Sequence, residues 1–258
     1  MSAKEKTKDI KGLKNVKDQY EDYPYPARDP EEEKDRLLVC AGDNLHEINH
    51  WLFKGKKKFD KNFRILVAGG GTGDASTYYA AQLEGTGAEV VYLDFSKASL
   101  EIAKRRAEIR GAKNIKFIHD SILNIPNLDL GKFDLINCFG CLHHLESPDE
   151  GLKLLTSLLK EDGGMHLMVY AKYGRTAVYH IQELMKLVND GEENRAQEVA
   201  NAKLMLDRLP NTNWFARSPD LFNDHITYGV LVFMICSYIS KIELILFLKC
   251  LIMLKIKV

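Results

Sequence analysis

The fold is decided by the stretch Ile65-Leu-Val-Ala-Gly69-Gly-Gly-Thr-Gly73-Asp74, an apolar run that leads straight into a glycine turn. Such glycines let the backbone bend sharply and let a ligand approach the first amides of the following helix. The spacing is Gly-x-Gly-x-Gly, which is neither the dinucleotide fingerprint nor a P-loop. We expect the charge of Asp74 to repel a pyrophosphate and to tolerate a cationic ligand. The alternative is a tight strand-to-helix turn without a ligand.

Outward from this turn, short apolar runs alternate with helical stretches, which is typical of βαβ units and a parallel sheet. Most of the runs are nearly continuous in apolar character, as strands covered on both faces must be. The sequence therefore predicts an α/β fold. The predicted strands are 63–68, 89–94, 115–119, 133–139 and 165–170, and the predicted helices between them are 74–83, 96–109 and 148–159.

The flanks of this core have a different character. Residues 1–17 alternate lysine with polar residues and are predicted to be disordered. Residues 18–61 are predicted to form a cap, in which prolines hold 20–26 as an extended aromatic strip and helices follow over 29–40 and 44–53. We assign the cofactor-binding core to 62–172, and to 173–228 a helical substrate cover with helices over 173–190 and 192–208.

The charge and cysteine content restrict the class of protein. The 258 residues carry 36 Lys and Arg against 36 Asp and Glu. Binding to nucleic acid through phosphate neutralisation needs a basic surface, so no nucleic-acid partner is expected. The five cysteines lack the spacing of a disulfide framework or a metal site, and the polar start of the chain has no signal region. These features predict a reduced, cytoplasmic protein with no metal ion and no membrane partner, and they do not indicate an oligomeric state.

Acidic residues stand at the tips of the second and third predicted strands. Asp94 is followed by Phe95, and Asp120 is followed by Ser121. The carboxyl ends of parallel strands share one edge of a sheet, where a carboxylate can accept both hydroxyls of a ribose. Asp94 suits that role, and Asp120 suits the exocyclic amine of adenine. The alternative for either acid is that it caps its own loop.

These motifs, in this order, resemble the class I S-adenosylmethionine-dependent methyltransferases over about 110 residues, from Asn62 to Arg175. The glycine turn resembles the first motif of that family, Asp94 its ribose-binding acid, and Asp120 with Ser121 its adenine-edge motif. The stretch from Phe133 to Pro148 resembles the part beside the methyl donor. The sequence departs from the family at Val67, where many members have an acid that holds the amino group of the cofactor.

The resemblance implies a three-layer, Rossmann-like fold with a mostly parallel sheet, S-adenosylmethionine as cofactor, and methyl transfer. The balanced charge favours a small-molecule acceptor over RNA or DNA. A protein side chain is kept as an alternative acceptor. An NAD-dependent oxidoreductase and a non-catalytic cofactor-binding module are kept as alternative functions. The expected cofactor-binding residues are Ala68, Gly69, Gly70, Gly71, Gly73, Asp94, Phe95, Asp120, Ser121 and Phe139.

Histidines and tyrosines supply the remaining candidates. His143 and His144 follow the fourth predicted strand, and His144 is the candidate general base, although packing is the favoured role for both. Tyr20, Tyr23 and Tyr25 form either an aromatic lid over the cofactor or simple packing on the sheet edge.

The last 30 residues, 229–258, do not have the composition of a soluble domain. Their uninterrupted apolar run of about a dozen residues is shorter than the ~20 that a membrane span needs. We interpret this apolar tail as the product of a reading-frame change near Gly229, and the alternative is a buried β-hairpin.

Overall fold

The computed structural model describes residues 20–21, 24–40, 42–145, 147–170, 173–192, 194–217 and 250–254. The chain divides into two compact units, Met1–Val169 with Lys249–Val258, and Tyr170–Leu248. The predictions for 1–17, for Tyr23 and for residues 229–249 and 255–258 of the apolar tail concern residues outside the described part of the chain.

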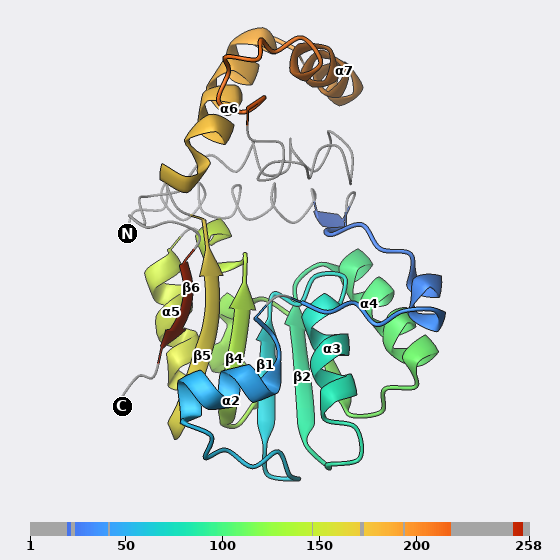
Figure 1. Cartoon of the computed structure of the whole chain (residues 1–258), viewed down its shortest axis with the longest axis vertical. Helices are drawn as coiled ribbons and strands as arrows, with labels where there is room; N and C mark the ends of the chain where they lie inside the picture. Colours follow the sequence, from blue (N-terminus) through green and yellow to red (C-terminus); the bar gives the residue numbers. More distant parts are fainter. Residues whose placement is uncertain are drawn as a thin grey trace. The chain divides into compact units, whose positions relative to one another are not determined.

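The first unit is built on a six-stranded sheet in the order β3-β2-β1-β4-β5-β6 (Figure 1). The first five strands are parallel, and β6 pairs with β5 in the antiparallel direction. The strands are β1 (Arg64–Ala68), β2 (Glu89–Asp94), β3 (Ile115–His119), β4 (Phe133–Phe139), β5 (Leu159–Val169) and β6 (Cys250–Leu254). The predicted α/β fold with a mostly parallel sheet is confirmed.

The start of the fifth strand was predicted wrongly. β5 begins at Leu159 rather than at residue 165, because Leu159 pairs with Phe133 before the register shifts and Gly164 pairs with Leu135. Gly163 lies in this irregularity, where a Cβ atom would be 2.9 Å from the carbonyl oxygen of Phe133. An interrupted ladder of this kind has no periodic signature in the sequence.

Helices α2 (Leu45–Phe53) and α3 (Asp74–Gln82) lie on one face of the sheet, toward the viewer in Figure 1. Buried side chains from both helices pack with Ile65, Val67 and Leu135 of the strands. Asn44, the first residue of the predicted helix, caps α2 instead by accepting hydrogen bonds from the amides of His46 and Glu47.

Helix α4 (Lys97–Arg110) packs against α3 and the β2–β3 edge of the sheet. Ser96 caps its first turn and Gly111, with a φ of 73°, ends it, which is close to the predicted helix over 96–109. Helix α5 (Pro148–Ser157) precedes β5 and packs against the 3₁₀ helix η2 (Ile122–Asn127).

The helix predicted over 29–40 is a single 3₁₀ turn, η1 (Pro30–Lys34). Asp29 and Pro30 start it as expected, but the side chain of Glu33 turns inward to two arginines of α4. The carbonyl of Arg36 accepts a hydrogen bond from Arg110 and not from a helical amide. Long-range ion pairing therefore overrides the local helical preference.

The second unit contains α6 (Thr176–Val188) and α7 (Arg195–Leu206), preceded by the 3₁₀ turn η4 (Tyr173–Arg175). One side of α6 packs with Ala202 and Phe215 in a small core, and the amide of Asn201 donates to Asn189. Both helices are close to their predicted bounds.

One part of the apolar tail is described, namely β6, which forms the edge of the sheet next to β5. The proposed change of reading frame is a statement about the gene and stays a prediction. Among the described residues, no helix is both long and apolar enough to cross a lipid bilayer.

Candidate functional site

The glycine turn wraps around the end of β2. The amides of Gly69 and Gly70 both donate to the carbonyl of Leu93, at 2.8 and 3.2 Å. The backbone φ angles of Gly69, Gly71 and Gly73 are 72°, 52° and 96°, values that residues other than glycine rarely adopt. The glycines are therefore required by the backbone conformation of the turn.

Close packing adds to this requirement. A Cβ atom on Gly69 would lie 2.5 Å from the sulfur of Cys141, and one on Gly71 would lie 2.8 Å from the carbonyl oxygen of Tyr25. A Cβ on Gly70 would run into the ring of Tyr92, whose hydroxyl donates to the carbonyl of Gly71. The turn is thus enclosed by β2, the loop after β4 and the N-terminal aromatic strip.

Asp94 is joined directly to the glycine turn. One carboxylate oxygen accepts from the amide of Gly71 at 2.8 Å, and the other accepts from the amide of Ser96 at 2.8 Å. The residue is 7% exposed. Burial raises the pKa of Asp94, and the hydrogen bonds from the backbone amides offset this in part. A carboxylate has about four lone-pair sites, so Asp94 keeps acceptor capacity for a further donor.

The other predicted cofactor residues lie at the same edge but make local contacts. Asp120 accepts from the amide of Ser121 at 2.7 Å and from the side chain of Asn124, while Ser121 caps η2. These contacts match the loop-capping alternative without excluding a ligand. The ring of Phe139 lies 5.0 Å from that of His166 on β5.

The N-terminal aromatic strip contacts both sides of this edge. The ring of Tyr20 lies 5.9 Å from that of Phe95, after β2, and 6.2 Å from that of His144, after β4. Glu21 accepts hydrogen bonds from the first amides of α4, and the carbonyl of Pro26 accepts one from Thr72 in the glycine turn.

A family model described as a methyltransferase domain matches residues 59–222, which include the glycine turn, Asp94 and the whole parallel sheet. The chain belongs to the methyltransferase domain family. The resemblance to class I S-adenosylmethionine-dependent methyltransferases is therefore confirmed, and the match extends beyond Arg175, where the motifs of the sequence end.

Individual relatives support this membership. A demethylmenaquinone methyltransferase of Clavibacter sepedonicus is 35% identical over 100 residues, covering 39% of this chain and 38% of the relative. An uncharacterized protein of Synechococcus sp. is 35% identical over 201 residues, 77% of this chain and 47% of that protein. An uncharacterized protein of Rickettsia prowazekii is 25% identical over 202 residues, and the match covers 34% of that protein. The chain thus spans less than half the length of each of these relatives.

Among solved structures, the chain is similar to PKMT2 from Rickettsia typhi in complex with AdoHcy. The TM-score is 0.56 at 20% sequence identity, covering 82% of this chain and 40% of that chain. At this identity the similarity concerns the fold alone, and it confirms the Rossmann-like methyltransferase fold predicted from the sequence.

Within this methyltransferase domain, Asp74 does not have the predicted role toward a ligand. Its carboxylate pairs with Arg28 at 2.7 Å and with Arg106 at 2.5 Å. Burial raises the pKa of Asp74, but the hydrogen bond from Arg28 and the charge of Arg106 outweigh it and the net pKa is lowered. Because two arginines already compensate this charge, our argument from Asp74 against a pyrophosphate was wrong, whereas the argument from the glycine spacing is unaffected.

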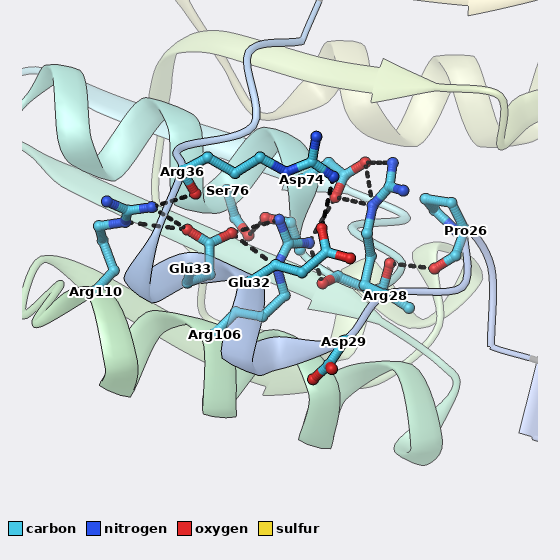
Figure 2. A network of polar contacts seen from close by, with 12 residues as sticks. Pro26, Arg28, Asp29, Glu32, Glu33, Arg36, Asp74, Ser76, Arg106 and Arg110 are labelled. Atoms are coloured by element: carbon cyan, nitrogen blue, oxygen red, sulfur yellow. Dashed lines mark hydrogen bonds and ion pairs between the residues drawn. The ribbon is translucent and has the colours of Figure 1, made fainter.

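These pairs belong to a network that joins residues 28–36, which follow the aromatic strip, to the glycine turn and α4 (Figure 2). Arg106 donates to Glu33 at 2.7 Å and to the carbonyl of Thr72 at 2.8 Å, and Arg110 donates to the other oxygen of Glu33 at 2.7 Å. Arg106 is 1% exposed and Glu33 is 3% exposed. The sequence analysis did not find this network.

A second group that the sequence analysis missed is a buried polar cluster formed by Asp43, Tyr79, Asn137 and His166. One oxygen of Asp43, Oδ1, accepts hydrogen bonds from Tyr79 at 2.6 Å and Asn137 at 2.8 Å and faces Nδ1 of His166 at 2.9 Å. The available signal was the presence of Asn137 and His166 inside otherwise apolar strands, since buried polar groups require partners.

The cysteines and other metal ligands do not form a site in the described part of the chain. There, no group of three or more His, Cys, Asp or Glu side chains is close enough together to hold a metal ion. Cys40, Cys138 and Cys141 are free thiols. A hydrogen bond with Cys138 and burial raise the pKa of Cys141 well above its ordinary value, so this thiol is a poor nucleophile at neutral pH.

Proposed function

We propose that the protein transfers a methyl group from S-adenosylmethionine to a small-molecule acceptor. The observation that carries this proposal is the contact of Asp94 with the amide of Gly71, which joins a carboxylate to the glycine turn in a chain of the methyltransferase family. In this proposal the methionine portion of the cofactor lies against the glycine turn, and Asp94 supplies acceptors for the ribose hydroxyls.

Methyl transfer from a sulfonium requires little acid or base catalysis. A lone pair of the acceptor attacks the methyl carbon while the bond from that carbon to the sulfonium sulfur breaks, which leaves a neutral thioether. The acceptor then loses a proton if it carried one. Because the leaving group is already activated, the protein mainly aligns the two partners and excludes water.

The small-molecule acceptor is proposed on two grounds. The formal net charge is zero, so the chain lacks the charge excess that attracts nucleic acid. Relatives include a demethylmenaquinone methyltransferase and a ubiquinone biosynthesis O-methyltransferase, although a tRNA 5-carboxymethoxyuridine methyltransferase is also among them. The function of the helices in 173–228 as a substrate cover, and the cytoplasmic location, stay predictions.

Calorimetry with S-adenosylhomocysteine and with NAD tests the cofactor. We expect the 258-residue chain to bind S-adenosylhomocysteine and not NAD, because the glycine spacing lacks the third glycine of the dinucleotide fingerprint. Binding of NAD alone would favour the oxidoreductase. Methyl transfer is then measured with labelled S-adenosylmethionine and a protein-free methanol extract of cells, and cofactor binding without any transfer would favour the non-catalytic module.

Replacing His144 with alanine tests for a general base. His143 is 1% exposed and its ring packs on that of His144 at 4.2 Å, so His143 lacks the access to an acceptor that a base requires. His144 also packs against Tyr20. Because we expect His144 to serve in packing, turnover of the His144→Ala variant should fall by less than about tenfold. Loss of a general base would typically lower turnover by a factor of about 10² to 10⁴. A hundredfold fall with unchanged cofactor affinity would make His144 the catalytic base.

A further inference from the structure

The buried polar cluster contains a carboxylate whose bonding is incomplete. Asp43 is 2% exposed, yet Tyr79, Asn137 and His166 all direct their polar atoms to its Oδ1. None of the hydrogen bonds formed by the described residues ends on the side-chain oxygen Oδ2. A buried carboxylate is costly unless its charge and its lone pairs are matched.

A second atom of the cluster also lacks a partner. Because Nδ1 of His166 faces the Asp43 carboxylate, we assign the ring proton to Nδ1, which leaves Nε2 as an acceptor. His166 is fully buried, and its Nε2 has no hydrogen-bond partner among the described residues. A buried polar atom without a partner needs an explanation, and a ligand or water is the usual one.

The cluster lies beside the end of β1 that leads into the glycine turn. Asn137 is the register partner of Val67 in β1 and of His166 in β5, so the three residues form one row across the sheet. Val67 is followed by Ala68, the last residue of β1 before the turn.

Asp43 differs from the other acids near the turn because its partners all bind one of its two oxygens. Asp74 has two arginines, Asp94 has two backbone amides, and Asp120 has an amide and Asn124. Asp43 has hydroxyl, amide and imidazole partners on one oxygen, and it has no Lys or Arg partner among the described residues. A cationic donor would complete its bonding.

S-adenosylmethionine has two cationic groups, and only one of them can donate hydrogen bonds. The sulfonium has no hydrogen on its charged atom, whereas the α-ammonium group of the methionine portion has three donors. An ammonium–carboxylate hydrogen bond is of the strong, charge-assisted kind. Val67, the residue of β1 in the same row, is apolar and cannot supply this acceptor.

We propose that Asp43 binds the α-ammonium group of the cofactor through Oδ2, and that Tyr79, Asn137 and His166 position its carboxylate. This proposal rests on the proposed use of S-adenosylmethionine. Asp43 is then a binding residue that reaches the turn from the loop before α2, and the three partners act through it.

A comparison of two ligands distinguishes binding of the ammonium group by Asp43 from a purely structural role of Asp43. S-adenosylhomocysteine has the ammonium group, whereas 5′-methylthioadenosine keeps the adenosine and the thioether but lacks the amino-acid portion. For Asp43→Asn we expect the affinity for S-adenosylhomocysteine to fall by about tenfold or more, and that for 5′-methylthioadenosine by less than about twofold, as measured by calorimetry. The exposed Asp129→Asn is the matched control and should change neither affinity.

Tyr79→Phe removes one donor to Asp43 while it keeps the charge of that residue. Because Tyr79 acts through Asp43, this variant should lower the affinity for S-adenosylhomocysteine by a smaller factor than Asp43→Asn and change that for 5′-methylthioadenosine by less than about twofold. An equal loss of both ligands in Asp43→Asn would overturn the proposal, as would no loss at all. If Asp43→Asn does not fold, a crystal structure of the unmodified protein with S-adenosylhomocysteine decides. A distance of more than about 4 Å between the ammonium nitrogen and the Asp43 carboxylate would reject the contact. If the unmodified protein binds neither ligand, the proposed cofactor itself is wrong and this proposal falls with it.

Discussion

Replacement of Arg106 by methionine is expected to lower the free energy of unfolding by about 3–5 kcal/mol. Arg106 is 1% exposed and makes ion pairs with Glu33 and Asp74, both of which would remain in place without it. The carbonyl of Thr72 would also lose its donor. Truncating one partner of a buried network costs more than the network contributes net, because the remaining charges stay desolvated.

Denaturant unfolding of the folded protein measures this effect, and Arg105→Met is the matched control. Arg105 lies next to Arg106 on α4, but its side chain is 54% exposed and its pairs with Glu31 and Glu108 lie on the surface. Surface pairs contribute about 0–1 kcal/mol, so the control should unfold nearly as the original protein does. Similar midpoints for the two variants would mean that the network in Figure 2 does not stabilise the fold.

This network and the buried polar cluster around Asp43 explain why part of the fold could not be predicted from the sequence. Glu33 and Arg106 are 73 residues apart, and Asp43 and His166 are 123 residues apart. Side-chain pairs at such separations leave no period and no spacing motif in the chain. The inward turn of Glu33 also removes the helix that the local sequence at Pro30 favours.

The parts that were predicted correctly depend on local or repeating features. Buried parallel strands are continuous apolar runs, so four of the five predicted strands lie within one residue of their observed bounds. Asp94 and the glycine turn could be placed together because both follow strand ends, and strand ends of a parallel sheet share an edge. The cofactor roles of the individual residues at this edge stay predictions.

Asp94 is where the largest loss of cofactor binding is expected. Removing one buried acceptor of a ribose hydroxyl pair costs about 1–3 kcal/mol, or about tenfold to a hundredfold in affinity. Asp94→Ala should fall at the upper end of that range, because it also deprives the amides of Gly71 and Ser96 of their acceptor and thereby loosens the glycine turn. Calorimetric titration with S-adenosylhomocysteine measures the loss.

Asp94→Asn separates the two contributions. The asparagine keeps an oxygen for one of the two backbone amides, but it loses the negative charge and one of the two acceptors that a diol requires. We therefore expect Asp94→Asn to bind S-adenosylhomocysteine more weakly than the original protein and more tightly than Asp94→Ala. If the folded Asp94→Ala variant has unchanged affinity, the proposed contact between Asp94 and the ribose is rejected. The carboxylate would then serve only to hold the glycine turn against β2.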